Sequence, residues 1–312
     1  MTILCVTANP NIERTWIVPH FSPGQINRVE SIFINPSGKG NNVGRAIQIL
    51  GGNPICTGIL GGNSGRYLAE MMEKKDIRSF WTWIEAETRT SCILIDPETR
   101  KNDSTLLSEP GPHVQEADWD RFEKDILSAA KEINVACLCG SIPQGSSPNI
   151  YAHLVRKLKD LGISVWVDCD GAALSLAVQA KPEGIKINLR EFEGLAGRDL
   201  RNRRDILTVG KEFLRGGIRR LVVTMGSKGA VMMGEEDVFW GKAAVTEAIS
   251  SVGSGDAFFA GLLLGIDRDL PIDQSFRMGL ACGAANTLQP GACSFKRADY
   301  DLFLDLIEIK RI

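Results

Sequence analysis

The chain has 312 residues, 44% of them hydrophobic, which is enough to bury the core of one large α/β domain. Its 36 Lys and Arg residues nearly balance 38 Asp and Glu residues, and no basic run is dense enough to indicate a nucleic-acid partner. The apolar stretch 3–8 lacks a basic leader and is broken by Asn9-Pro10-Asn11, and no later apolar run is long enough to span a bilayer. We therefore expect a cytoplasmic protein that binds neither nucleic acid nor membrane.

Short apolar runs alternate with amphipathic segments along the chain. The runs typical of buried strands are residues 3–7, 54–59, 135–139, 163–167, 185–188 and 221–224. The segments with helical spacing of apolar residues are 40–50, 119–131, 148–161 and 203–214. This alternation predicts a parallel sheet connected by helical crossovers.

Two segments break the alternation and predict antiparallel strands outside the main sheet. Residues 15–34 contain two prolines and a glycine, and residues 80–107 alternate Trp and Ile with polar residues. We expect them to form a small sheet over one edge of a single domain spanning 1–312, with lid excursions at about 14–35 and 79–108. Its apolar face needs a partner, either the substrate cleft or a second subunit. The alternative is that both segments extend the main sheet.

The eight cysteines and three histidines argue against a disulfide framework or a zinc site. Most of the cysteines lie among apolar and β-branched residues, as buried reduced thiols do. Cys137 and Cys139 are separated by one residue, which is the wrong spacing for a redox or zinc pair. We expect free thiols and no zinc.

The segment from Ser250 to Asp256 predicts an anion-binding loop at the start of a helix. Gly253 and Gly255 flank Ser254, so unpaired backbone N–H groups can converge on a phosphate with little steric hindrance. Asp256 would repel that phosphate, which indicates a base that takes the proton of a phosphoryl-acceptor hydroxyl. Taken alone, the segment is explained more simply by Gly255 turning the chain and Asp256 serving as a favourable first-turn acid.

Further motifs follow one another along the chain. They are Thr7-Ala8-Asn9-Pro10, Ser37-Gly38-Lys39-Gly40-Asn41-Asn42-Val43, Thr88-Arg89-Thr90, Glu109-Pro110-Gly111-Pro112, Gly140-Ser141-Ile142-Pro143, Asp168, Asn188-Leu189-Arg190-Glu191, Val223 to Gly229 and the 250–256 loop. In this order they resemble the ribokinase-like (PfkB) carbohydrate kinases, in the branch that contains 1-phosphofructokinase and tagatose-6-phosphate kinase. The resemblance implies a ribokinase-like three-layer α/β/α fold with a mostly parallel central sheet, a small β-sheet lid and a homodimer formed through that lid.

The resemblance also implies which residues hold the sugar. They are Glu13, Gly38, Lys39, Asn42, Arg89 and Ser141. Lys39 adds a positive charge where a predicted helix opens, and Arg89 offers the bidentate geometry that a phosphate accepts. Together they predict a sugar that already carries a phosphate, although either one alone is more often a solvated surface charge. Glu13 stands where the family usually has Asp, and Ser37 and Asn41 also depart from its pattern, which leaves the sugar open.

On the nucleotide side, the resemblance places Asn188 and Glu191 beside Mg²⁺, mostly through water, and the phosphates of ATP. A helix cap with Glu three residues later is the alternative explanation of this pair. The remaining nucleotide contacts that the resemblance implies are Thr224, Gly226, Ser227, Gly229 and, within the helical wall 281–287, Asn286. A simple hairpin turn also explains residues 224–229. The resemblance further implies a monovalent cation such as K⁺ beside the 250–256 loop.

These observations predict an ATP-dependent kinase of a sugar phosphate of the fructose 1-phosphate, fructose 6-phosphate or tagatose 6-phosphate type. Asp256 accepts the proton of the attacking hydroxyl, and the backbone of Gly253, Ser254 and Gly255 forms the anion hole. One alternative is a kinase of an unphosphorylated sugar or a nucleoside, and another is a non-catalytic sugar-phosphate or nucleotide sensor. No G-x-G-x-x-G follows the first strand and no G-x-x-x-x-G-K-[ST] occurs, which argues against a dinucleotide-dependent oxidoreductase and a P-loop.

Overall fold

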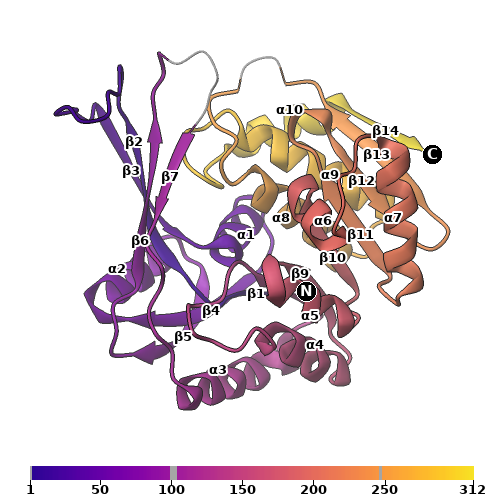
Figure 1. Ribbon diagram of the computed structural model, residues 1–312, viewed down its shortest axis with the longest axis horizontal. Coiled ribbons are helices and arrows are strands. Elements are labelled where there is room, and N and C mark those ends of the chain that lie inside the picture. Colours follow the sequence, from indigo (N-terminus) through magenta and orange to yellow (C-terminus); the bar gives the residue numbers. More distant parts are fainter. Residues whose placement is uncertain (1, 99–103, 246–247) are drawn as a thin grey trace.

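The computed structural model describes residues 2–98, 104–245 and 248–312 and is built around a ten-stranded sheet (Figure 1). In spatial order the strands are β14 (Ile307–Arg311), β13 (Val238–Ala243), β12 (Ala230–Met233), β11 (Arg220–Thr224), β10 (Gly184–Asn188), β9 (Ser164–Asp168), β8 (Val135–Cys139), β1 (Ile3–Thr7), β4 (Pro54–Gly61) and β5 (Arg78–Ile84). The strands from β11 to β5 run parallel, and β12, β13 and β14 are added antiparallel at one edge. All six strands expected from the apolar runs are confirmed as members of this sheet.

Helices cover both faces of the sheet. One face packs on α1 (Lys39–Ile49), α2 (Gly62–Glu73), α8 (Ser254–Asp267), α9 (Ile272–Asn286) and α10 (Arg297–Leu306). The other packs on α3 (Glu116–Ala129), α4 (Ile150–Asp160), α5 (Gly171–Gln179), α6 (Leu189–Ala196) and α7 (Arg203–Arg215). Short 3₁₀ turns occupy Ala130–Glu132 and Gly226–Lys228. The two helical layers explain why β1 and β8 are apolar on both faces, and they confirm the three-layer α/β/α prediction.

A second sheet of four strands projects from the domain at the upper left of Figure 1. Its order is β3 (Ser31–Ser37), β2 (Asn11–Ile17), β6 (Arg89–Ile95) and β7 (Ser104–Ser108). We call these four strands the lid sheet. Its outer pairs are antiparallel, but β2 and β6 are parallel, so the expectation of a purely antiparallel sheet is wrong at its centre.

The expected lid boundaries also need correction at β5. This strand lies inside the predicted excursion 79–108 yet pairs in parallel with β4 at the edge of the main sheet, as the alternative interpretation held. As an edge strand, β5 is only partly covered: Thr82 is buried, whereas Trp83 next to it is 44% exposed. The lid strands within that excursion are β6 and β7, while its residues 99–103 lie outside the described part of the chain.

The strand order places a crevice at one end of the sheet. β4 lies on one side of β1 and β8 on the other, so the direction in which strands are added reverses at β1. Ligands of open α/β sheets bind beyond the carboxyl ends of the strands at such a reversal. Asp168, Asn188 and Thr224 end neighbouring strands at this edge. No helix among the described residues is both long and apolar enough to cross a membrane.

Candidate active site

The 250–256 loop leads directly into α8. Gly253 is the N-cap in the left-handed conformation (φ 76°), and a Cβ built there would lie 2.5 Å from the Cβ of Ala292, so glycine is required on both grounds. The first bond of the helix runs from the Ala257 N–H to the Gly253 carbonyl at 2.8 Å. The N–H groups of the turn before it are therefore the kind that bind anions at a helix start. The Ser254 N–H differs, because it donates to the Ser251 carbonyl at 3.2 Å.

The Asn286 side chain stabilises this loop through hydrogen bonds inside the protein. It is fully buried, and its amide nitrogen donates to the Val252 carbonyl at 2.8 Å and to the Ser254 hydroxyl at 3.0 Å. Its amide oxygen accepts the Cys293 N–H at 2.7 Å. The structure thus uses the Asn286 side chain inside the protein, beneath the anion-binding loop and not in an open nucleotide wall. The resemblance implies a nucleotide contact for Asn286, whereas its hydrogen-bond partners among the described residues are all within the protein.

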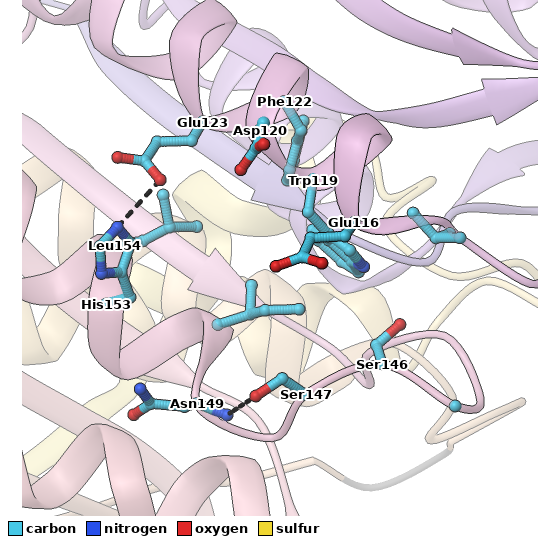
Figure 2. Close-up of a pocket in the computed structure, with 13 residues that line it drawn as sticks. Glu116, Trp119, Asp120, Phe122, Glu123, Ser146, Ser147, Asn149, His153 and Leu154 are labelled. Atoms are coloured by element: carbon cyan, nitrogen blue, oxygen red, sulfur yellow. Dashed lines mark hydrogen bonds and ion pairs between the residues drawn. The ribbon is translucent and has the colours of Figure 1, made fainter.

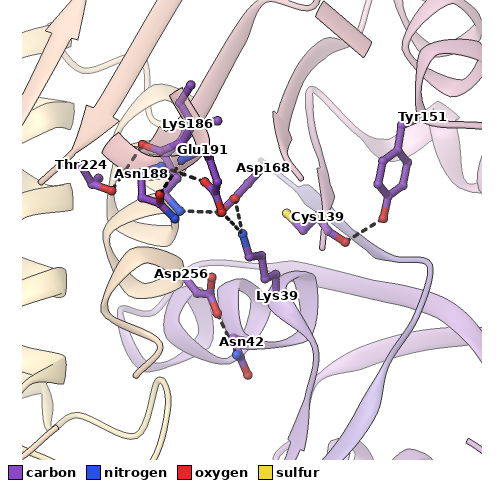
Figure 3. Close-up of polar contacts among 11 residues, drawn as sticks. Lys39, Asn42, Cys139, Tyr151, Asp168, Lys186, Asn188, Glu191, Thr224 and Asp256 are labelled. Carbon is purple, nitrogen blue, oxygen red and sulfur yellow. Dashed lines mark hydrogen bonds and ion pairs between the residues drawn. The ribbon is translucent and has the colours of Figure 1, made fainter. Parts of the chain in front are cut away.

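Asp256 lies in the first turn of α8 with only 7% of its surface exposed. The Asn42 amide nitrogen, from α1, donates to Asp256 Oδ2 at 2.8 Å (Figure 3). Burial raises the pKa of Asp256, as does Asp168, whereas Lys186, Lys39 and the Asn42 hydrogen bond lower that pKa. The net pKa shift is upward, which is the direction expected of a carboxylate tuned for proton transfer.

Two lysines share one buried carboxylate beside Asp256 (Figure 3). Asp168, which ends β9 and is 0% exposed, accepts from Lys39 Nζ through Oδ1 at 2.7 Å and from Lys186 Nζ through Oδ2 at 2.6 Å. Burial raises the pKa of Asp168, but the two ammonium groups outweigh this and hold it below its usual value. Burial lowers the pKa of Lys39, but Asp168, Glu191 and Asp256 raise it well above its usual value. The cluster therefore carries two cations for one ionised Asp168.

Asn188 and Glu191 form a reciprocal capping box at the start of α6. The Glu191 N–H donates to Asn188 Oδ1 at 2.9 Å, and the Asn188 N–H donates to Glu191 Oε2 at 2.8 Å. Glu191 Oε1 lies 3.5 Å from Lys39 Nζ. Both residues also line a cavity of about 450 Å³ together with Arg190 and Asp170. The helix-cap interpretation is thus correct as a description of local structure, and it leaves both side chains facing an open volume.

These two residues fit a weakly held Mg²⁺. Among the described residues, no cluster of three or more His, Cys, Asp and Glu side chains could hold a metal ion by itself. Mg²⁺ commonly takes only one or two protein carboxylates and keeps water or substrate phosphates as its other ligands. The hard oxygens of Asn188 and Glu191 at the rim of a cavity match that pattern.

Glu13 and Asn42 meet at a buried serine. Ser37 Oγ lies 3.1 Å from Glu13 Oε2 and 3.0 Å from Asn42 Oδ1. Glu13 is 5% exposed, and its other oxygen, Oε1, is buried with no hydrogen-bond partner among the described residues. Burial raises the pKa of Glu13, while Arg45 and Ser37 lower it. Gly38 precedes α1 at φ 107°, where a Cβ would lie 2.5 Å from Thr7 Cγ2. An unpaired carboxylate oxygen here is suited to a ligand hydroxyl.

Arg89 and Ser141 both contact Asn9. Its guanidinium donates to the Asn9 carbonyl at 3.1 Å and to the Ser108 hydroxyl at 2.7 Å, and the Asn9 amide nitrogen donates to Ser141 Oγ at 3.5 Å. Lys39 instead points its ammonium at Asp168. Lys39 is thus held by Asp168 and Glu191, whereas Arg89 is held by Asn9 and Ser108, and the single phosphate site expected of the two stays a prediction.

The segment from Thr224 to Gly229 connects β11 to the antiparallel β12, so it is a hairpin connection, as the simpler interpretation held. Gly226 and Gly229 have positive φ values of 57° and 88°. The Met225 N–H donates to the Gly229 carbonyl at 2.8 Å and closes the turn. Thr224 ends the strand beside Asn188, which brings this hairpin to the same edge as the capping box.

The eight cysteines are free, and seven of them are buried, as the sequence predicts. Two charged residues of the site escaped sequence reasoning. Lys186 lies between two isoleucines in a buried strand, and a lysine at such a position is a signal that it pairs with a carboxylate. Arg45 follows Asn42 by three residues on α1 and is 3% exposed, so its position on a buried helix face was the available signal.

A separate cavity of about 380 Å³ lies between α3 and α4 (Figure 2). Trp119, Glu123 and His153 line it, with the His153 ring bonded to Glu123 at 2.9 Å. None of the site residues expected from the sequence lines this cavity. This cavity is therefore not part of the candidate active site, which is marked by the convergence of Asp256, Asn42 and the two lysines.

Comparisons with known proteins agree with this geometry. A family model described as pfkB family carbohydrate kinase matches residues 1–298. The chain is 26% identical over 312 residues to a 1-phosphofructokinase of Haemophilus influenzae, covering 100% of this chain and 99% of that protein. It is 28% identical over 310 residues to a tagatose-6-phosphate kinase of Staphylococcus epidermidis, covering 98% and 99%.

Solved structures share the fold over the whole chain. Phosphofructokinase-2 from Escherichia coli, in complex with substrates and products, superposes with a TM-score of 0.90 at 24% identity, covering 98% of this chain and 99% of that one. A protein from Thermotoga maritima described as a possible 1-phosphofructokinase has a TM-score of 0.91 at 25% identity, with 100% of both chains covered. Since the family model spans nearly every residue and the site geometry agrees with it, the chain belongs to the pfkB family of carbohydrate kinases.

Proposed function

We propose that this carbohydrate kinase transfers the γ-phosphoryl group of ATP to a hydroxyl of a sugar phosphate of the fructose 1-phosphate, fructose 6-phosphate or tagatose 6-phosphate type. The observation that carries the proposal is the Asp256 carboxylate, fixed by Asn42 beside a helix start and two lysines. This arrangement supplies a base, an anion site and positive charge within one crevice. The names of the relatives support the sugar-phosphate class.

Asp256 serves as the general base in this proposal. Asn42 holds Oδ2 at 2.8 Å, which leaves Oδ1 to accept the proton of the acceptor hydroxyl as its oxygen attacks the γ-phosphorus in line. Glu13 and Asn42 orient the sugar through its other hydroxyls, and the unpartnered Glu13 Oε1 is the acceptor that such a contact needs. Positioning of this kind accounts for a large part of the rate enhancement in enzymatic phosphoryl transfer.

The developing negative charge is met by main-chain and ammonium donors. In this proposal, the N–H groups at the start of α8, including those of Gly253 and Gly255, bind the anion at the helix N-terminus, while the Ser254 N–H is used by the Ser251 carbonyl. We assign Lys39 and Lys186 to the transferred phosphoryl group, because Asp168 holds both ammonium groups beside Asp256. This assignment replaces the earlier expectation that Lys39 contacts the phosphate already on the sugar.

ATP and Mg²⁺ belong at the Asn188–Glu191 edge. Bound Mg²⁺ neutralises the β- and γ-phosphate oxygens of ATP. Asn188 and Glu191 would hold the metal mostly through water, and they line a cavity of about 450 Å³ in which the phosphates would lie. Thr224, Gly226, Ser227 and Gly229 border the nucleotide at the same sheet edge. A monovalent cation such as K⁺ beside the 250–256 loop stays a prediction.

The phosphate on the sugar is assigned to Arg89 and Ser141. Arg89 is held by the Asn9 carbonyl and the Ser108 hydroxyl at the base of the lid sheet, and the Asn9 side chain contacts Ser141. An ordered guanidinium offers two parallel N–H donors to a phosphate. Because Lys39 has its own carboxylate partners, Arg89 alone now carries the argument for a phosphorylated substrate over a free sugar.

Steady-state kinetics with a panel of acceptors tests the proposal. Purified protein with ATP and Mg²⁺ is assayed with fructose 1-phosphate, fructose 6-phosphate, tagatose 6-phosphate, free hexoses and a nucleoside. We expect the highest kcat/KM for a sugar phosphate, and we expect Arg89→Met to raise KM for that substrate while leaving KM for ATP unchanged. A higher kcat/KM for a free sugar or nucleoside would refute the substrate class. Binding without transfer to any acceptor would support the sensor alternative.

A further inference from the structure

Arg45 is a buried cation that has no role in the proposed phosphoryl transfer. It lies on α1, three residues after Asn42, with 3% of its surface exposed. Its Nη2 donates to Asn42 Oδ1 at 2.8 Å and to the Ala292 carbonyl at 2.7 Å, and its Nη1 donates to Asn35 Oδ1 at 3.0 Å. Its hydrogen-bond acceptors are thus neutral oxygens and its Nε is buried with no partner among the described residues, although the charges of Glu13 and Asp256 also attract it. Burying a guanidinium that has only neutral hydrogen-bond acceptors costs free energy of folding, which indicates that Arg45 has a function at this position.

The contact with Asn42 determines which way the Asn42 amide faces. A guanidinium has donors only, so the amide atom that faces Arg45 must be the oxygen. The Ser37 hydroxyl lies 3.0 Å from Asn42 Oδ1, but it also lies 3.1 Å from Glu13 Oε2 and has only one proton to donate, so the Arg45 contact is what fixes the amide. The amide nitrogen is then turned the other way, where it donates to Asp256 Oδ2 at 2.8 Å.

We infer that Arg45 is a positioning residue that locks the Asn42 amide so that its N–H, and not its carbonyl oxygen, meets Asp256. This inference rests on the proposed role of Asp256 as the base. Without Arg45 the amide can rotate by half a turn and present its oxygen to the carboxylate, which repels it. Arg45 therefore acts on catalysis through Asn42, without touching substrate.

The orientation of Asn42 matters because a base must be ionised to accept a proton. A hydrogen bond donated to the carboxylate stabilises its charged form, so the Asn42 N–H lowers the pKa of Asp256 against the larger upward effects of burial and Asp168. Losing that donor moves the pKa of Asp256 further up. The other charged or titratable groups that interact electrostatically with Asp256 are Asp168 on β9, Lys186 on β10, Lys39 and Arg45 on α1, Glu13 on β2, Cys139 on β8 and Cys293 before α10.

The first experiment compares Arg45→Met, Arg45→Lys and the wild-type protein in their kcat/KM for the sugar phosphate as a function of pH. For Arg45→Met we expect a loss of about 10- to 100-fold in kcat, the effect of losing one charge-assisted hydrogen bond. We also expect the acidic limb of the profile to move to higher pH and KM for ATP to stay unchanged. Arg45→Lys keeps the positive charge but lacks the planar arrangement of donors. We expect a smaller loss of kcat in this variant and a shift of its acidic limb in the same direction.

The matched control is Arg277→Met. Arg277 on α9 also donates from a partly buried guanidinium to backbone carbonyls, those of Leu304 and Ile307, but it makes no contact with Asn42 or Asp256. We expect this variant to lower the melting temperature without moving the acidic limb. If Arg277→Met moves the limb as Arg45→Met does, the pH effect reports general loosening and the inference fails.

A double-mutant comparison tests whether Arg45 acts through Asn42. If it does, Arg45→Met should lower kcat in the wild-type background and have little further effect in an Asn42→Ala background. An equal loss in both backgrounds would contradict the inference. If Arg45→Met does not fold, the Arg45→Lys profile is decisive, and an unshifted limb in that variant would overturn the inference as well.

The Asp256→Asn variant separates this inference from the function on which it rests. If Asp256→Asn keeps near-normal turnover, the base assignment itself is wrong. If Asp256→Asn loses turnover while both Arg45 variants keep the wild-type kcat and pH profile, the proposed function stands and the role of Arg45 alone is refuted.

Discussion

At the scale of single residues, the site depends on opposing influences on one carboxylate. Burial and Asp168 raise the pKa of Asp256, and Lys186, Lys39 and Asn42 lower it, with a net upward shift from its ordinary value of 3.8. A base works in its ionised form, so a raised pKa means that activity is lost at a higher pH than for an ordinary aspartate as the solution is acidified. We therefore predict an acidic limb in the kcat/KM profile above pH 3.8.

Two substitutions should move that limb in opposite directions. Lys186→Met removes a group that lowers the pKa of Asp256 and should move the limb to higher pH. Asp168→Asn removes a group that raises this pKa and should move the limb to lower pH. Both variants are expected to lose turnover as well, so the informative readout is the position of the limb. Equal positions in the two variants would show that another group controls the limb.

At the scale of elements, the lid sheet gathers residues from distant parts of the sequence. The register aligns Phe33 of β3, Thr15 of β2, Ile93 of β6 and Leu106 of β7 in one row across the sheet. Side chains alternate along a strand, so this row shares a face with Glu13, two residues before Thr15 on β2. Phe33 is 42% and Leu106 is 60% exposed. Exposed apolar side chains on the sheet face that also carries Glu13 are the kind that a second subunit covers.

We predict that the protein forms a homodimer through this face of the lid sheet. Analytical ultracentrifugation should find a dimer for the wild-type chain and a shift toward monomer for Phe33→Asp and Leu106→Asp, since burying a charge in an apolar interface is unfavourable. The matched control is Leu302→Asp on α10, which is 59% exposed and lies outside the lid sheet. The prediction would be contradicted if the wild-type protein were a monomer, or if Leu302→Asp dissociated the dimer while the two lid-sheet variants did not.

Sequence patterns identified the buried elements better than the partly exposed ones. The strand expected at residues 135–139 is β8 itself, because a strand covered on both faces reads as an unbroken apolar run. β5 was misassigned to the lid because an edge strand and a lid strand share the same alternation, and only pairing with β4 separates them. The parallel pairing of β2 with β6 could not be predicted either. The relative direction of two strands depends on how they are connected, which the spacing of apolar residues does not encode.

The same limit applies to the site. Asp256 and its loop could be found because a glycine-flanked helix start has a local signature. The partner of Lys39 could not, because Asp168 lies 129 positions away and the pairing exists only once β9 is beside β8 and α1. Arg45 acts through a contact with Asn42 whose importance depends on Asp256, 214 positions from Asn42. Long-range polar pairs of this kind are a property of the folded molecule.

At the scale of the whole molecule, the parallel sheet brings the candidate site residues to one edge. The strand ends carry Asp168, Asn188 and Thr224, α1 and α8 meet over them through Asn42 and Asp256, and the lid sheet contributes Glu13 and Arg89. Each group comes from a different element, so catalysis depends on the assembled domain. The central claim is that Asp256 accepts the proton from a sugar-phosphate hydroxyl as the γ-phosphoryl group of ATP is transferred.

The turnover of the Asp256→Asn variant, measured together with its affinity for ATP, tests this claim most directly. The substitution keeps the size of the side chain but removes its basicity. We predict that ATP binds with nearly unchanged affinity while kcat for the preferred sugar phosphate falls by about 10²–10⁴-fold or more, as expected for a positioned base. Turnover close to that of the wild-type enzyme, with ATP bound normally, would contradict the account.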